Sequence, residues 1–140
     1  MGPLLFLIYV NDVDDSLLNC KLFKFADDMK LSIHFPATDI HFSRHILLQQ
    51  DLSSIQDWCS RWILEINCSK CVCLHFGHNN PNQSYQIEDA IIPNSTEVVD
   101  LGVLVNTNLK PSAQCRRAAA KAQRMLAIIK MAFASFDIRT

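Results

Sequence analysis

Glycine is scarce in this chain, with only 3 among 140 residues. Because glycine adopts left-handed backbone without steric cost, its scarcity predicts few tight turns. Charged residues are also few, at 19% against 49% hydrophobic residues. That balance excludes a disordered chain and predicts a packed core, and the length fits one domain with at most a small appendage.

The chain also lacks a long apolar segment at its beginning. The run Leu4–Val10 is far too short to span a bilayer. No basic residue precedes it, and the acidic stretch Asn11–Asp15 stands where a signal peptide would have a small-residue cleavage site. We therefore expect an intracellular protein that is not secreted and has no membrane contact. Its six cysteines should be reduced thiols rather than a disulfide framework.

Charge is distributed unevenly along the sequence, although the net charge is only −1. Residues 1–100 hold 13 acidic and 6 basic side chains, whereas residues 101–140 hold 7 basic side chains and the single acid Asp137. A basic end on a nearly neutral chain concentrates any nucleic-acid contact there. The plainer interpretation is a solvated helix face.

The hydrophobic pattern predicts an α+β fold. A short helix should begin at Pro3, which suits a first helical position. The segment Lys21–Phe35 has two β-favouring stretches around Ala-Asp-Asp, and its second half alternates apolar and polar residues. It predicts a β-hairpin with Asp27 and Asp28 near the tip.

Two longer helices are expected. The first should start near Asp39, a good N-cap, and carry one apolar face. That face comprises Leu48, Leu52, Ile55, Cys59 and Trp62. The second should run from Ser112 to Phe133, with basic residues on one face and apolar residues on another. The apolar face comprises Ala118, Ala122, Met125, Ile129 and Phe133.

Short strands are predicted between these helices. A turn at Asn67–Lys70 should lead into a strand over Lys70–Phe76. Strands near Tyr85–Ile87 and Ala90–Ile92 should pair as a hairpin, and Val98–Val105 is expected to be one strand with a glycine inside it.

The acidic pair raises a chemical question. Adjacent residues in a strand point to opposite faces, so Asp27 and Asp28 can act on one site only where the chain turns. Two carboxylates about 4 Å apart repel by roughly 4 kcal/mol at an effective dielectric constant near 20. A divalent cation relieves this repulsion, and hard oxygen ligands suit Mg²⁺. Taken alone, however, Asp-Asp is more often a solvated turn.

The neighbouring residues resemble a known family. Phe25-Ala26-Asp27-Asp28 resembles the aromatic-Ala-Asp-Asp box of reverse transcriptases, in particular those of non-LTR (LINE-type) retrotransposons. Further blocks resemble that family in the same order and cover residues 2–133. They are Gly2–Asp12, Lys21–Leu31, Leu48–Leu52, Trp58, Trp62, Asn67–Cys71 and Asp100–Val103.

This resemblance implies a partial right-hand polymerase palm, made of a β-hairpin and short antiparallel strands packed on helices, followed by a C-terminal helix. Residues 1–109 would hold the end of motif B, the Ala-Asp-Asp hairpin, motif D and primer-grip-like strands. Residues 110–140 would be a basic helix that begins the thumb. We expect the palm to be truncated before the first catalytic aspartate.

The resemblance also implies roles for particular residues. Asp27 would be a direct ligand in a site for two Mg²⁺ ions, and Asp28 would coordinate or tune it. Lys70 matches the motif D lysine that protonates pyrophosphate, or else is a surface lysine in a turn. Phe25 would lie under the primer end, and Gly102 would belong to a primer grip or to an ordinary core strand. The basic residues contacting template–primer phosphates would be Arg116, Arg117, Lys121 and Arg124.

The implied partners are an RNA template, a DNA primer and dNTPs.

Two departures from the family pattern matter. An extra residue, Lys24, stands before the box and would mean an insertion or a change of strand register. The third carboxylate, expected from an upstream strand, has no counterpart, so we predict that this chain alone does not polymerise.

Two further interpretations remain open. The chain could be a non-catalytic, nucleic-acid-binding relic of a transposon. It could be a small zinc module, because potential ligands crowd into one short stretch, although they do not form the usual two separated pairs. Those ligands are Cys68, Cys71, Cys73, His75 and His78. Finally, uncovered apolar surface should favour self-association.

Overall fold

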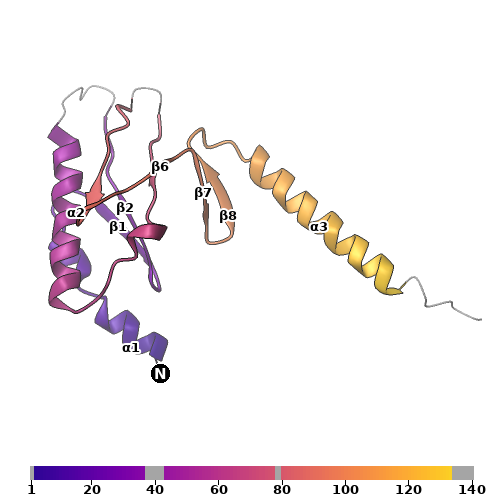
Figure 1. Cartoon of the computed structure of the whole chain (residues 1–140), viewed down its shortest axis with the longest axis horizontal. Helices are drawn as coiled ribbons and strands as arrows, with labels where there is room; N and C mark the ends of the chain where they lie inside the picture. The colour runs from indigo at the N-terminus through magenta and orange to yellow at the C-terminus, as the bar shows by residue number, and fades with distance from the viewer. Residues whose placement is uncertain (1, 37–42, 78–79, 134–140) are drawn as a thin grey trace, which may run out of the picture. The chain divides into compact units, whose positions relative to one another are not determined.

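The structure is a computed structural model that describes residues 2–36, 43–77 and 80–133. It combines α-helices with small two-stranded sheets, which confirms the predicted α+β class. The chain divides into two compact units (Figure 1). The first comprises residues 1–73 and 79–94, and the second comprises residues 74–78 and 95–140.

The first unit is built on two helices. Helix α1 spans Gly2–Tyr9, and helix α2 spans Ser43–Arg61. A short 3-10 helix, η1, spans Val13–Ser16 after α1, and another, η2, spans Cys68–Lys70 after α2. The N-cap predicted at Asp39 lies outside the described residues.

A β-hairpin packs beside α2 in this unit (Figure 1). Strand β1, Lys21–Phe25, pairs antiparallel with β2, Asp28–Ser32. Leu22 lies opposite Leu31 and both face the protein interior. The hairpin prediction is confirmed, but β2 ends at Ser32 instead of continuing to Phe35 as expected.

Two apolar clusters form the core of the first unit. One joins the end of α1 and η1 to α2 through Val10, Val13, Ile55, Trp58 and Cys59. The other gathers around Tyr85, Ile87 and Ile92 and includes three half-buried cysteines, Cys68, Cys71 and Cys73. Ile87 of the second cluster belongs to the predicted hairpin of β4, Gln86–Ile87, and β5, Ala90–Ile91, which the structure confirms.

The strand predicted over Lys70–Phe76 is mostly irregular. Only β3, Cys73–Leu74, has strand geometry, and Cys73 N donates to Pro93 O at 3.0 Å. A similarly short strand, β6, spans Asn94–Ser95.

The second unit contains β7, Glu97–Asp100, paired antiparallel with β8, Val103–Asn106, and the long helix α3, Ser112–Phe133. Leu104 N donates to Gln114 Oε1 at 2.8 Å, which ties β8 to the first turn of α3. The bounds predicted for this helix are confirmed.

The single strand predicted over Val98–Val105 is wrong, because the chain reverses at Leu101 and Gly102. Both residues have positive φ angles, 46° and 84°. This is the combination that a type I′ hairpin turn requires, so Gly102 occupies the tip of a hairpin instead of the middle of a strand.

The expectation of few tight turns is also wrong. Three hairpins close with two-residue turns, and in each the first turn residue is a non-glycine residue in the left-handed region. These residues are Ala26, Glu88 and Leu101, with φ angles of 52°, 53° and 46°. Scarcity of glycine did not prevent such turns; it left them with a backbone strain of roughly 1–2 kcal/mol per residue.

Trp62 does not join the buried face of α2, contrary to prediction. Helix α2 stops at Arg61, and Leu64 N closes its end by donating to Cys59 O at 2.9 Å, while Ile63 takes a positive φ. This turn carries Trp62 away from the core and leaves it 43% exposed, where its ring packs edge-on against Tyr9.

Among the described residues, no helix combines the length and apolarity needed to cross a membrane.

Candidate active site

The acidic pair lies where β1 turns into β2. Ala26 and Asp27 form the turn, and Asp28 is the first residue of β2. Both aspartates are exposed. Because the chain reverses between β1 and Asp28, the two carboxylates belong to one hairpin tip instead of opposite faces of a straight strand. The predicted position of the pair is confirmed.

An aromatic ring accompanies the pair. Phe25 lies directly opposite Asp28 in the register, so the two side chains share the outer face of the hairpin. Phe25 is 62% exposed despite being apolar. Phe23, two residues earlier on the same face, is also exposed, and the Lys21 ammonium lies 4.9 Å from its ring centroid. The tip thus combines an accessible ring with accessible carboxylates.

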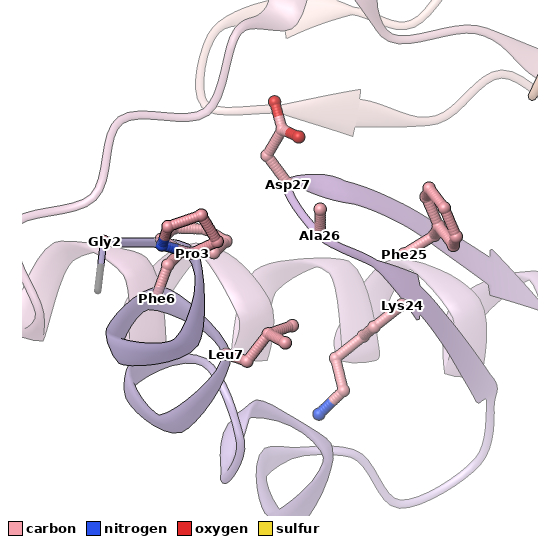
Figure 2. A pocket seen from close by; sticks show the side chains of 8 residues that line it. All are labelled: Gly2, Pro3, Phe6, Leu7, Lys24, Phe25, Ala26 and Asp27. Carbon is pink, nitrogen blue, oxygen red and sulfur yellow. The ribbon is translucent and has the colours of Figure 1, made fainter.

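An open groove of about 570 Å³ runs between the start of α1 and the hairpin tip (Figure 2). Its wall is mostly apolar on the helix side, and residues 24–27 form the hairpin side. Figure 2 shows the Asp27 carboxylate projecting from the tip away from α1, while Lys24 extends along α1. The lining residues are Gly2, Pro3, Phe6, Leu7, Lys24, Phe25, Ala26 and Asp27.

Lys24 holds the hairpin against the end of α1. Its Nζ donates to the carbonyl oxygens of Val10 at 3.1 Å and Asn11 at 3.0 Å, and it forms an ion pair of 3.1 Å with Asp14. A cation is favourable at a helix C-terminus, where carbonyl groups lack intrahelical donors. Strand β1 pairs residue for residue with β2 through Lys24, so this residue occupies a regular strand position on the inward face.

The two carboxylates at the tip are the type of ligand that Mg²⁺ prefers, because they are hard oxygen donors open to solvent. Two carboxylates alone, however, are few ligands for a metal ion. Within residues 2–36, 43–77 and 80–133, no three His, Cys, Asp or Glu side chains lie together in a way that could hold a metal ion. The same finding applies to the described members of the proposed zinc set, and His78 lies outside the described residues.

The other predicted site residues are not among those that line the groove. Lys70 is exposed at the end of η2 in the first unit, in the turn that the sequence predicted there. Gly102 forms part of the β7–β8 turn in the second unit, and apart from its chain neighbours no described residue has a heavy atom within 4 Å of the position that a Cβ would take there. Four residues of α3 were predicted to contact phosphates, and all four are exposed: Arg116, Arg117, Lys121 and Arg124.

Asp51 holds the segment that leads into β1, a role that the sequence did not predict. This buried residue of α2 accepts backbone hydrogen bonds from Leu18 at 3.2 Å, Asn19 at 2.9 Å and Cys20 at 2.6 Å. Burial by itself raises the pKa of Asp51, but these hydrogen bonds outweigh it and hold the pKa below its ordinary value. The sequence held one signal for this role. Asp51 lies three residues after Leu48, so it places a carboxylate on the otherwise apolar face of the helix.

A comparison with protein families finds one match. The family described as reverse transcriptase (RNA-dependent DNA polymerase) matches residues 1–124. Neither the curated proteins nor the solved structures that were compared gave a match.

Proposed function

We propose, from the premise that this chain belongs to the reverse transcriptase (RNA-dependent DNA polymerase) family, that it supplies the metal-binding hairpin of a polymerase palm. The observation that carries the proposal is the exposed Asp27–Asp28 pair at a two-residue hairpin turn, inside the Phe-Ala-Asp-Asp box. In this proposal residues 1–109 are palm, and residues 110–140 begin the thumb. The order of the matching sequence blocks supports a non-LTR retrotransposon as the source.

The hairpin tip carries the chemistry in this proposal. Asp27 and Asp28 would hold Mg²⁺, which when bound activates a primer 3′-hydroxyl and neutralises charge on the phosphates. Asp27, which lies in the turn itself, acts as the direct ligand. The exposed ring of Phe25 supports the primer end by stacking. Lys70, whose ammonium is free to reach solvent, donates a proton to the departing pyrophosphate.

The second unit would bind the template–primer duplex. The exposed cations of α3 contact backbone phosphates, which gives affinity without sequence preference. At the β7–β8 turn, Gly102 leaves open space where any other residue would place a Cβ. A nucleic-acid backbone can therefore approach this turn closely, as a primer grip requires.

The polypeptide 1–140 should not polymerise by itself. Two-metal nucleotidyl transfer in this family uses a third carboxylate, and none lies near Asp27 and Asp28 among the described residues. Without it, two like charges share a site that does not hold two cations in line.

A graft tests the catalytic proposal. Residues 1–124 would replace the corresponding segment of an active reverse transcriptase, and RNA-templated dNTP incorporation would be measured. We expect incorporation that Asp27→Asn reduces by at least about a hundredfold. The matched control is Asp89→Asn, because Asp89 holds the same second turn position in the β4–β5 hairpin.

Binding of template–primer by each graft controls for folding. If Asp89→Asn abolishes incorporation as completely as Asp27→Asn while both grafts still bind, the assignment of Asp27 is wrong. Incorporation by residues 1–140 alone would contradict the proposed dependence on a third carboxylate.

A second function is favoured by the small donor set and the exposed basic helix. In this alternative the chain binds nucleic acid without catalysis. The graft separates the two, because a binding module would supply duplex affinity and no incorporation dependent on Asp27.

A further inference from the structure

Two cysteines bracket the turn that carries Lys70. Cys68 begins η2, Cys71 immediately follows it, and Cys71 N donates to Cys68 O at 3.2 Å. In a 3-10 helix, side chains three residues apart lie one above the other, with Cα atoms about 6 Å apart. A disulfide needs a Cα separation of roughly 4.4–6.8 Å. The backbone therefore already has the spacing of a disulfide.

The two sulfur atoms lie against the same short stretch of backbone. Cys68 Sγ is 3.7 Å from Ile66 O, and Cys71 Sγ is 3.4 Å from Asn67 O. Burial and then the neighbouring Cys68 raise the pKa of the Cys71 thiol, which is the electrostatic result of two thiols close together. Both side chains are half-buried, so neither is sealed in the core.

Cys68 can be reached from solvent. It forms part of the wall of an open depression of about 510 Å³, together with Glu65, Ile66, Asn67 and Glu88. This depression is wide enough for a small molecule. Its two carboxylates favour a cationic or neutral reagent over an anionic one.

We propose that Cys68 and Cys71 form a redox-sensitive dithiol, which closes to a disulfide by exchange with a small cationic or neutral disulfide. The Cys68 thiolate attacks one sulfur of the reagent and releases its first thiol. Cys71 then attacks the Cys68 sulfur of the mixed disulfide and releases the second thiol. Each cysteine gives up one proton, the two released thiols take them up, and the protein loses two electrons to the reagent.

Two other cysteines of the first unit, Cys20 and Cys59, do not fit this role. Burial, followed by the hydrogen bond and the charge of Asp51, raises the pKa of Cys20 to about 12. Cys59 is buried in the first cluster, which also raises its pKa. Cys20 therefore forms little of the reactive thiolate, and buried Cys59 is closed off from a reagent in solution, so both should stay reduced. If Lys70 has the role proposed above, closing the disulfide would also fix the turn that presents it.

Cystamine, a cationic disulfide, is the probe. The chain 1–140 would be treated with cystamine, quenched with N-ethylmaleimide in acid and digested with trypsin without reduction. Cleavage after Arg61, Lys70 and Arg116 places Cys68 and Cys71 on separate peptides, residues 62–70 and 71–116. We expect these peptides to remain joined until a reductant is added, as mass spectrometry would show.

Two variants assign the bond. In Cys73→Ser/Cys115→Ser, Cys71 is the only cysteine left on peptide 71–116, and the link should persist. In Cys71→Ser it should fall at least about tenfold. Cysteamine adducts without a link in the wild type, or a link that survives Cys71→Ser, would overturn the proposal.

A comparison of two disulfides of opposite charge tests the reagent class. Glutathione disulfide is anionic and should react with the chain more slowly than cystamine does. Each rate is first divided by the rate of the same reagent with a free cysteine peptide. Glu65→Gln/Glu88→Gln should reduce this preference at least about threefold. An unchanged preference would contradict the role of the depression. These readouts are masses and rates of oxidation, so they are independent of whether the chain supports polymerisation.

Discussion

At the scale of single residues, Asp51 illustrates how one buried carboxylate can stabilise a loop. It collects three backbone N–H groups and the Asn19 side-chain amide, which the segment before β1 would otherwise leave without partners. Because its pKa is lower in the folded chain than in the unfolded one, its contribution is present above the unfolded value. It is lost as the pH falls through the folded value.

Replacing Asp51 by asparagine should lower the free energy of unfolding by about 2–4 kcal/mol at pH 7, because the charge is removed and an amide N–H group faces backbone donors. Urea unfolding followed by fluorescence of the buried Trp58 would measure it. The loss should shrink as the pH falls below about 4. Asp57→Asn, an exposed change in the same helix, is the control and should cost under about 0.5 kcal/mol. Equal losses, or a loss independent of pH, would contradict this account of Asp51.

Lys24 offers a second test at this scale. Lys24→Met removes the donor to two carbonyl groups at the end of α1 and should lower the free energy of unfolding by about 1–3 kcal/mol. Asp14→Asn breaks only the half-exposed ion pair and should cost less than about 1 kcal/mol. Chemical denaturation of both variants would decide. If the two losses are equal, the ion pair and not the carbonyl contacts holds the hairpin.

At the scale of elements, the sequence predicted what depends on local pattern. The bounds of α3 follow from unbroken helix-forming residues after Pro111, and the β1–β2 hairpin follows from alternation around Ala-Asp-Asp. The turn at Leu101–Gly102 was missed because one glycine inside an apolar run also fits a strand. The exposed position of Trp62 was missed because an isoleucine in a left-handed helix end gives no sequence signal.

The candidate site was also predictable only where a local sequence pattern marks it. The sequence located Asp27 and Asp28 at a turn because their identities match a family box. The role of Asp51 depends on contacts with residues more than thirty positions earlier in the chain, which no local pattern encodes.

Helix α3 makes a testable prediction as an element. None of its described side chains is buried, and Arg117 and Lys121, one turn apart, lie on the same face. Arg117→Gln/Lys121→Gln should weaken binding to an RNA–DNA hybrid and reduce the slope of log affinity against log salt by about 1–2. Fluorescence anisotropy at several salt concentrations would measure this. Arg61→Gln/Lys110→Gln removes the same charge elsewhere, and an equal effect would argue against a binding face on α3.

At the scale of the whole molecule, the exposed apolar surface of α1 predicts self-association in solution. Its sequence is apolar around the helix, and Leu4, Leu5 and Ile8 are 60–65% exposed. Helices that are apolar on all sides are normally buried, so this surface should be covered by another chain when residues 1–140 are expressed alone.

We expect concentration-dependent self-association by sedimentation velocity. Leu5→Lys/Ile8→Lys should shift the chain towards monomer, whereas Leu18→Lys/Leu109→Lys, two exposed leucines outside α1, should not. A wild-type chain that stays monomeric at every concentration would contradict the prediction.

The hairpin tip as a metal site is the central claim, and paramagnetic broadening by Mn²⁺ in amide NMR spectra of the 1–140 chain tests it most directly. The β4–β5 turn carries a second acidic pair, Glu88–Asp89, and serves as an internal comparison. Broadening should be strongest at residues 26–29 and should disappear from them in Asp27→Asn. Equal broadening at both hairpin tips, or broadening at residues 26–29 that survives Asp27→Asn, would contradict the claim.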